Sequence, residues 1–322
     1  MRRTLLLGLK IAVSVGLLYF ALRKVDIGEL LSRINIDSAR WLVLAVVVAL
    51  LQVLLGALRW REITVKCSAP LSLPQALRYN LVGTFFNQVL PSSIGGDAVR
   101  LWLLRNTGAG WRNAAYSVFI DRAIGLIALA VLVVASLPWS YQLITDSQGR
   151  LALAAIDLIA LGGGLGFLIL GHLPWPVLRR WWLTHHPYNC SVIAWRALVD
   201  RNSGLKISAL SLMVHVLTAV MGWCVARSID APVEPFQIFL VLPPVILITM
   251  LPIAIAGWGV RETAMMVAFS YAHLPEQDGI NVSLLFGAVT FTVGLMGGLV
   301  WILSAEKKLH QAAAGQSSKA PG

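Results

Sequence analysis

The sequence predicts an all-α polytopic membrane protein, and three observations lead to that fold class. Only 13% of the 322 residues are charged and 57% are hydrophobic, whereas about a quarter of the residues in a soluble domain are charged. The apolar residues gather in blocks as long as a bilayer-crossing helix needs, about 20 residues for a ~30 Å core. Two more apolar segments are interrupted by proline and glycine, which break helices.

Six of the apolar blocks are predicted to be full transmembrane helices. They cover residues 4–22, 41–58, 114–137, 151–171, 205–226 and 282–303. The first block lacks a small-residue cleavage site, so we interpret it as an uncleaved helix rather than a signal peptide. The basic, tryptophan-rich stretch 175–201 is typical of a membrane interface. We expect residues 1–305 to form one membrane domain and residues 306–322 to form a disordered cytoplasmic tail.

The two interrupted segments, residues 75–104 and 236–269, resemble each other. The residues that break them are Pro91, Gly95 and Gly96 in the first segment and Pro252, Gly257 and Gly259 in the second. In each segment an arginine, Arg100 or Arg261, follows the proline by nine positions (100 − 91 = 261 − 252 = 9). The two prolines are 161 positions apart (252 − 91 = 161), which is half the length of the chain. This indicates an internal duplication, with halves of about 1–145 and 146–305.

We predict that each interrupted segment is a re-entrant hairpin, which leaves the membrane on the face where it enters. Three full spans separate the two hairpins, so the hairpins enter from opposite faces and the halves form an inverted repeat. In transporters, paired segments of this kind mark a substrate site near the middle of the membrane. An alternative stays open at this point, in which both segments are kinked full spans.

Positive charges gather on one side of the predicted topology. With the N-terminus inside, the cytoplasmic loops hold Arg59, Arg61, Lys66, Arg78, Arg100, Arg105, Arg112, Arg179, Arg180, Arg196, Arg201 and Lys206, and the tail holds Lys307 and Lys308. This agrees with the positive-inside rule and predicts a cell inner membrane protein with both termini in the cytoplasm. The connector 23–40 is an exception, because it places four basic residues, Arg33 among them, on the outside.

Several classes of function are disfavoured by the sequence. The formal charge of +11 lies in short runs between apolar blocks, so it does not form the basic face of a nucleic-acid-binding protein. The three cysteines are widely spread and imply no disulfide framework. His185 and His186 with Cys190 lack the further ligands of a zinc site. We find no nucleotide-binding loop, nucleophile elbow or metalloprotease motif, so we expect no cofactor, no metal and no enzymatic activity.

The breaks are the places where chemistry is expected. A helix that begins inside the membrane presents free N–H groups, which attract anions, and the planar guanidinium of arginine matches phosphate. We therefore expect Arg100 and Arg261 to face a phosphate-bearing headgroup. In the alternative, Arg100 extends to the membrane surface and Arg261 pairs with Glu262. Asp97 and Glu262 could pair with these arginines, bind a cationic headgroup or carry protons.

Other polar residues within the apolar blocks are weaker candidates. Asn87 precedes the first break, where it would cap the helix or contact the ligand. Asp121 and Arg122 are adjacent near a membrane boundary; a structural role is favoured for the pair, and Arg122 is kept as a substrate-binding candidate. Ionisable residues inside the membrane are functional candidates by default, and here they are Lys10, Asp157 and His215.

Three motifs resemble those of a known family. They are FFNQVLP at 85–91, GGDAVR at 95–100 and GWGVRE at 257–262. Over roughly residues 5–305 the sequence is similar to the lysylphosphatidylglycerol synthase transmembrane family, also described as flippase-like. In two-part synthases the resemblance implies that this module flips aminoacylated phosphatidylglycerol, while a separate soluble domain attaches the amino acid. Only a short tail follows the last predicted span here, so we expect no lysyl transfer, and the lipid need not be lysylated.

The sequence thus predicts a lipid translocase that moves a lipid with an anionic, phosphate-containing headgroup across the membrane. Its partners would be membrane lipids and possible separate lipid-modifying enzymes, and no nucleic acid. One alternative is a membrane-embedded lipid-modifying transferase with Asp97 as a base, although no histidine lies near either break. Another is a scaffold for a separate lipid synthase, which would not transport anything itself.

Overall fold

The structure, a computed structural model, describes residues 28, 33, 35–90, 94–173, 182–250 and 259–317, with α-helices as the main regular structure. Five helical stretches among these residues are long and apolar enough to cross a membrane. They are α3 (Ile36–Lys66), α5 with α6 (Gly95–Leu143), α7 (Ser147–Leu170), α10 (Gly204–Ser228) and the first part of α13 (Glu276–Ser304). The predicted all-α polytopic membrane fold is confirmed. A helix covers each predicted span except 4–22, which lies outside the described residues.

Shorter helices occupy the two interrupted segments. The first holds α4 (Leu73–Val89) and α5 (Gly95–Leu104), and the second holds α11 (Pro235–Thr249) and α12 (Val260–Tyr271). The longest of these, α4, has 17 residues and so measures only about 25 Å, less than the ~30 Å core of a bilayer. Both predicted breaks are therefore present as helix ends. Pro91, Pro252 and Gly257 lie outside the described residues.

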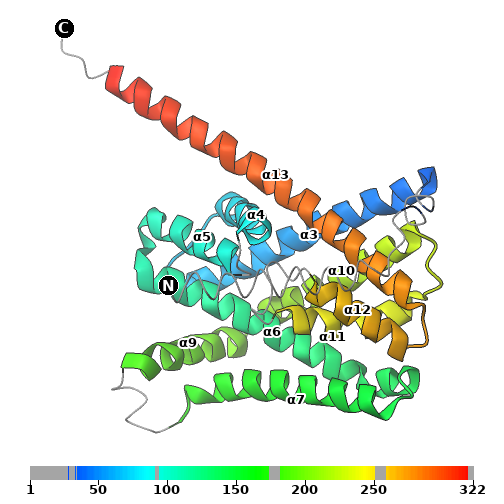
Figure 1. The fold of residues 1–322 in the computed structure, drawn as a ribbon. Coiled ribbons are helices and arrows are strands. Elements are labelled where there is room, and N and C mark those ends of the chain that lie inside the picture. The colour runs from blue at the N-terminus through cyan, green and yellow to red at the C-terminus, as the bar shows by residue number, and fades with distance from the viewer. Residues whose placement is uncertain are drawn as a thin grey trace, which may run out of the picture.

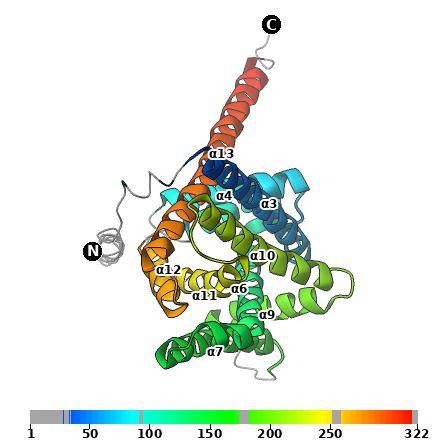
Figure 2. The ribbon, with the colours of Figure 1, turned by 90° about the vertical axis from the view of Figure 1, so that its right-hand side faces the viewer.

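The second half of the chain repeats the helix order of the first. In each half a long helix precedes a short one, the break, another short helix and a long one, giving α3–α4–α5–α6 and α10–α11–α12–α13. A π-helical turn, η1 (Arg105–Ala109), joins α5 to α6 (Gly110–Leu143), and α9 (Trp182–Val199) follows α7. In Figures 1 and 2, α7 lies at the edge of the bundle.

Packing between the helices is also alike in the two halves. α3 lies along α10, where small residues such as Ala45 and Ala49 allow close approach. α4 packs on α13 and α5 on α6, while α11 packs on α6 and α12 on α13. Each of these contacts therefore has an equivalent in the other half: α4 on α13 corresponds to α11 on α6, and α5 on α6 corresponds to α12 on α13. The inverted repeat stays a prediction, with which this scheme agrees.

The last helix differs from the prediction at its end. The chain was expected to leave the helical form after residue 303, but α13 (Glu276–Ser317) continues to Ser317. The added segment, AEKKLHQAAA at 305–314, is rich in strong helix formers and holds no proline, so nothing in it stops the helix. Figures 1 and 2 both show this end of α13 projecting beyond the other helices.

The first break depends on a close contact between two glycines. The Gly96 backbone N–H at the start of α5 donates a 2.8 Å hydrogen bond to Asn87 Oδ1 of α4. A Cβ on Gly96 would lie 2.0 Å from the Gly83 carbonyl oxygen and 2.6 Å from Asn87 Oδ1. Only glycine fits there. Asn87 thus satisfies one of the free N–H groups of the α5 N-terminus and holds the two short helices together.

We predict that Gly96→Ala destabilises the protein, because the added methyl group forces α5 away from α4 and breaks the Asn87 bond. Overpacking of this kind costs about 1–3 kcal/mol of unfolding free energy. Thermal unfolding of the purified protein in detergent measures it. Gly162→Ala on α7 is the control, because a Cβ there meets nothing within 4 Å. An unchanged melting temperature for Gly96→Ala would contradict the contact.

Candidate functional site

A polar cavity of about 250 Å³ lies inside the bundle, bounded by α3, α4, α5, α6, α10 and α13. Its ionisable lining residues are Arg59, Arg100, Asp121 and Arg122, and its neutral polar ones are Gln52, Asn80, Thr84, Asn87 and Thr290. Helices of both halves contribute to the wall. Residues on both sides of the first break, Asn87 and Arg100, therefore border a polar space among the membrane-spanning helices.

Asp121 on α6 is the acceptor for two arginines from two other helices. Arg59 of α3 donates from Nε to Asp121 Oδ1 at 2.9 Å, and Arg100 of α5 donates from Nη2 to Oδ2 at 2.9 Å. All three residues are buried. Buried carboxylates need such partners, because an unpaired charge away from water is costly. Asp121 therefore links α3, α5 and α6 at one point.

Asp97, at the start of α5, extends this arrangement. Arg122 of α6 donates two hydrogen bonds to the Asp97 carboxylate, from Nε to Oδ2 at 2.6 Å and from Nη2 to Oδ1 at 3.0 Å. Arg100 also donates from Nη1 to Asp97 Oδ1 at 3.3 Å. The charges alternate in the order Arg59, Asp121, Arg100, Asp97, Arg122, which we name the ion-pair chain. It contains three positive and two negative groups, so its formal charge is +1.

Two donors in the ion-pair chain have no acceptor among the described residues. They are Nη1 of Arg59 and Nε of Arg100, both of which are buried. The guanidinium of Arg100 also stacks over the ring of Trp60, 4.1 Å from the ring centroid, which fixes its plane. Arg122 is the accessible member, with 47% of its side chain exposed. The site therefore has spare donors and an unbalanced positive charge, as an anion-binding site requires.

The second break is arranged differently. Arg261 donates from Nη2 to Glu262 Oε1 at 2.9 Å and from Nε to Ser283 Oγ at 3.0 Å. Glu262 Oε2 accepts from the Gly259 N–H at 2.6 Å, and Gly259 has a φ of 83°, a conformation that favours glycine. Arg261 and Glu262 are buried and form a neutral pair that is not part of the cavity wall. The alternative in which Arg261 pairs with Glu262 is thus what the structure shows.

The sequence found part of this site and missed the rest. Asn87, Arg100 and Arg122 line the cavity and Asp97 belongs to the ion-pair chain, whereas Arg261 and Glu262 lie apart from it. Gly95 and Gly96 are buried at the start of α5.

Arg59 was placed in a cytoplasmic loop, which is wrong, because α3 runs on to Lys66 and buries it. A structural role was favoured for Asp121, and its ion pairs agree with that role, but its partners Arg59 and Arg100 were not foreseen. A signal was present on α3, where Gln52, Gly56 and Arg59 recur at helical spacing on one face. A lone polar stripe of this kind within an apolar helix points to a cavity.

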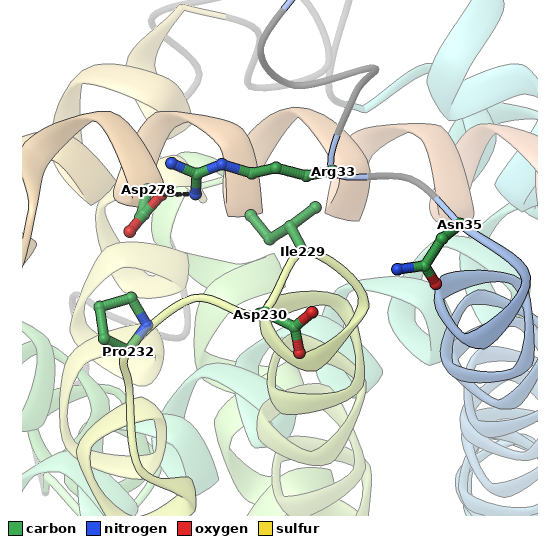
Figure 3. A pocket seen from close by; sticks show the side chains of 6 residues that line it. All are labelled: Arg33, Asn35, Ile229, Asp230, Pro232 and Asp278. Carbon is green, nitrogen blue, oxygen red and sulfur yellow. Dashed lines mark hydrogen bonds and ion pairs between the residues drawn. The ribbon is translucent and has the colours of Figure 1, made fainter.

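A second, more open pocket of about 470 Å³ lies at the N-terminal end of α3, beside its N-cap residue Asn35. Figure 3 shows Arg33 reaching along α13 to Asp278, with Nη1 2.8 Å from Oδ1. Asp230 and Pro232 of the α10–α11 loop close the other side. This ion pair accounts for one of the basic residues in the connector 23–40, which the topology had left without explanation. A second, Arg40, pairs with Asp37 on the surface.

Comparison with known proteins agrees with this architecture. Residues 7–298 match the family of the lysylphosphatidylglycerol synthase transmembrane region. The chain belongs to this family. It is also similar to a UPF0104 membrane protein of Methanothermobacter thermautotrophicus, with 23% identity in an alignment 335 residues long. The alignment covers 93% of this chain and 92% of that protein. The family match and the apolar helices together establish a multi-pass membrane protein.

We predict that Asp121→Asn is strongly destabilising, because it leaves Arg59 and Arg100 buried without their shared counter-charge. Removing one partner of a buried ion pair costs about 3–5 kcal/mol. The double variant Arg59→Gln with Asp121→Asn should regain part of this loss, because only one arginine then lacks its partner. Thermal unfolding in detergent compares them, with the exposed Asp37→Asn as control. A single variant as stable as the wild type would show that Asp121 is not the central acceptor.

Proposed function

We propose that this chain is a flippase-like translocase, which moves a lipid with a phosphate-containing headgroup across the cell inner membrane. The observation that carries the proposal is the positive charge of the ion-pair chain beside an intramembrane cavity. Charged groups inside a membrane are costly and mark substrate paths. The three arginines and two carboxylates have a formal charge of +1, which the single negative charge of a phosphodiester would neutralise.

The size of the cavity also supports a headgroup ligand. About 250 Å³ accommodates a phosphate and its immediate substituent, but not two acyl chains, which would stay in the surrounding lipid. Phosphate oxygens suit the planar fork of arginine, which donates parallel hydrogen bonds. Arg59 and Arg100 each have one buried N–H group from which such oxygens could accept a hydrogen bond. Arg122, half exposed, would meet the headgroup first and exchange part of its bond with Asp97.

The repeated helix order supports an alternating movement of the two halves around this site. Transporters built from inverted repeats expose a fixed midplane site first to one face and then to the other by movement of one repeat against the other. Here the corresponding short helices α5 and α12 both begin at a break and both carry an arginine in their first two turns, Arg100 or Arg261. On this proposal both termini are cytoplasmic, and α4–α5 and α11–α12 are re-entrant from opposite faces.

We predict that Arg122→Gln slows lipid movement about tenfold or more, because it neutralises the charge excess at the accessible end of the ion-pair chain. A hydrogen bond to a charged group is worth about 1.5–3 kcal/mol, and 1.4 kcal/mol is tenfold. The assay uses the purified protein in vesicles with a labelled phosphodiester lipid and follows its exposure to a membrane-impermeant quencher. Arg40→Gln, whose arginine is 79% exposed in a surface pair, is the matched control.

A labelled diacyl lipid without phosphate, with the same chains, tests the headgroup directly and should stay in its leaflet. Melting temperatures of all variants show whether each protein is folded. Movement of both lipids at equal rates would refute recognition of phosphate. A chemically altered lipid would instead indicate a transferase, and no movement of any phospholipid or polyprenyl phosphate, with ion gradients supplied, would indicate a scaffold.

A further inference from the structure

A buried carboxyl group on α7 takes no part in the site described above. Asp157 lies in the middle of this peripheral helix and is 1% exposed, whereas the next two residues, Leu158 and Ile159, are each 75% exposed. The buried face of α7 therefore includes Asp157, together with Leu153 four residues before it. α7 packs against α6, α9 and α11, and Figure 1 shows it running alongside α6.

Neither oxygen of the Asp157 carboxyl has a hydrogen-bond partner among the residues that the structure describes. The neighbouring positions Leu153, Ile156 and Ala160 belong to an apolar cluster with Leu129 of α6 and Leu247 of α11. An ionised carboxylate in such a place would have neither water nor a counter-charge, which is strongly unfavourable. This packing therefore suits the neutral carboxylic acid, with a proton bound.

No charged side chain among the described residues compensates Asp157 from the helices that pack against α7. On α11, Pro235–Thr249 holds no ionisable residue, and on α6 none lies between residues 123 and 140. The next residue of α6, Tyr141, packs against the same apolar cluster and contributes a phenol, not a positive charge. The ionisable residues of α9 that lie nearest to α7, such as Cys190, pack around Leu168, which is 11 residues or about 16 Å further along α7.

His215 of α10 lies beside two members of this apolar cluster, Leu129 and Ile246. Its Nε2 is 2.8 Å from the Gly125 carbonyl oxygen of α6. The gap between the His215 ring and these side chains is too narrow to hold water.

One face of α6 connects the two sites. Asp121, Gly125 and Leu129 follow one another at intervals of four residues, so they lie on the same side of the helix, about 6 Å apart along its axis. Asp121 anchors the ion-pair chain, Gly125 accepts from His215, and Leu129 packs in the cluster that surrounds Asp157. Any shift of α6 that rearranges the ion-pair chain must also disturb the packing around Asp157.

We propose that Asp157 is a proton-binding site whose protonation is linked, through α6, to lipid movement in the cavity. The inference rests on the proposed function for its transport part. When α7 separates from α6 and α11, water reaches Asp157, and its carboxyl O–H bond breaks to give a carboxylate and a hydrated proton. Proton uptake from water restores the carboxylic acid and allows α7 to pack against α6 and α11 again. A proton gradient would then drive the lipid in one direction.

Infrared difference spectroscopy of the purified protein tests the proton site without any transport. A carboxylic acid in apolar surroundings has a carbonyl stretching band that is separate from those of carboxylates and amides. We expect Asp157→Asn to remove such a band at neutral pH, and the exposed Asp37→Asn to leave it in place. An identical carbonyl spectrum for wild type and Asp157→Asn would overturn the proposal, because Asp157 would then hold no proton.

Vesicles with an imposed pH difference test the link to transport, with the labelled phosphodiester lipid as probe. We expect the wild type and Asp157→Glu to move lipid several-fold faster in one gradient direction than in the other. Asp157→Asn places a neutral side chain of nearly the same shape in the apolar cluster. This variant should therefore move lipid at one rate regardless of the gradient. A wild type without gradient dependence, or an Asp157→Asn variant that keeps it, would overturn the link.

The two proposals fail in different ways. If no sample moves lipid while the infrared band is present and lost in Asp157→Asn, the translocase function and the link to it are refuted, and the proton site stands. If lipid moves at rates that ignore the gradient, the translocase stands and the link is refuted.

Discussion

The arrangement of the cavity depends on one carboxylate that serves two buried arginines. Asp121 accepts from Arg59 of α3 and Arg100 of α5, and it belongs to α6, so three helices meet at its two oxygens. Without it, Arg59 would lose its carboxylate partner and Arg100 would keep only Asp97, so the cost of burying the two charges would be poorly offset. Other polar contacts extend from this point: Arg100 stacks over the ring of Trp60 and reaches Asp97, and Asp97 in turn holds Arg122 at the cavity wall.

The two breaks share an architecture but differ in electrostatics. At the first, the arginines outnumber the carboxylates and border a cavity. At the second, Arg261 and Glu262 neutralise each other and the Ser283 hydroxyl completes the group. The two segments therefore share a scheme of helix packing, whereas among the described residues of the two breaks the excess positive charge lies at the first. The proposed substrate site is asymmetric, although the helices around it follow a common plan.

Most of the fold could be predicted from the sequence, because long apolar blocks in a membrane have few alternatives to the helix. The breaks were also predictable, because proline and glycine occur together there. Proline by itself is a weaker signal, since Pro138 lies inside α6 and Pro243 inside α11. The site was harder to predict. The sequence RWRE around Arg59 has the composition of a loop, and only its position on the inner face of α3 reveals its role. Asp121 could not be assigned, since its partners come from residues 62 and 21 positions away.

The contacts of α13 constrain how the two halves can move. This helix packs against α4 of the first interrupted segment and α12 of the second. At Gly297 its backbone approaches α4 so closely that a Cβ would lie 2.0 Å from the Leu81 carbonyl oxygen. Because α13 is one continuous helix, a tilt that moves it away from α4 would also change its packing against α12. On the proposed mechanism, α13 would therefore couple the two interrupted segments, so that neither could move without the other.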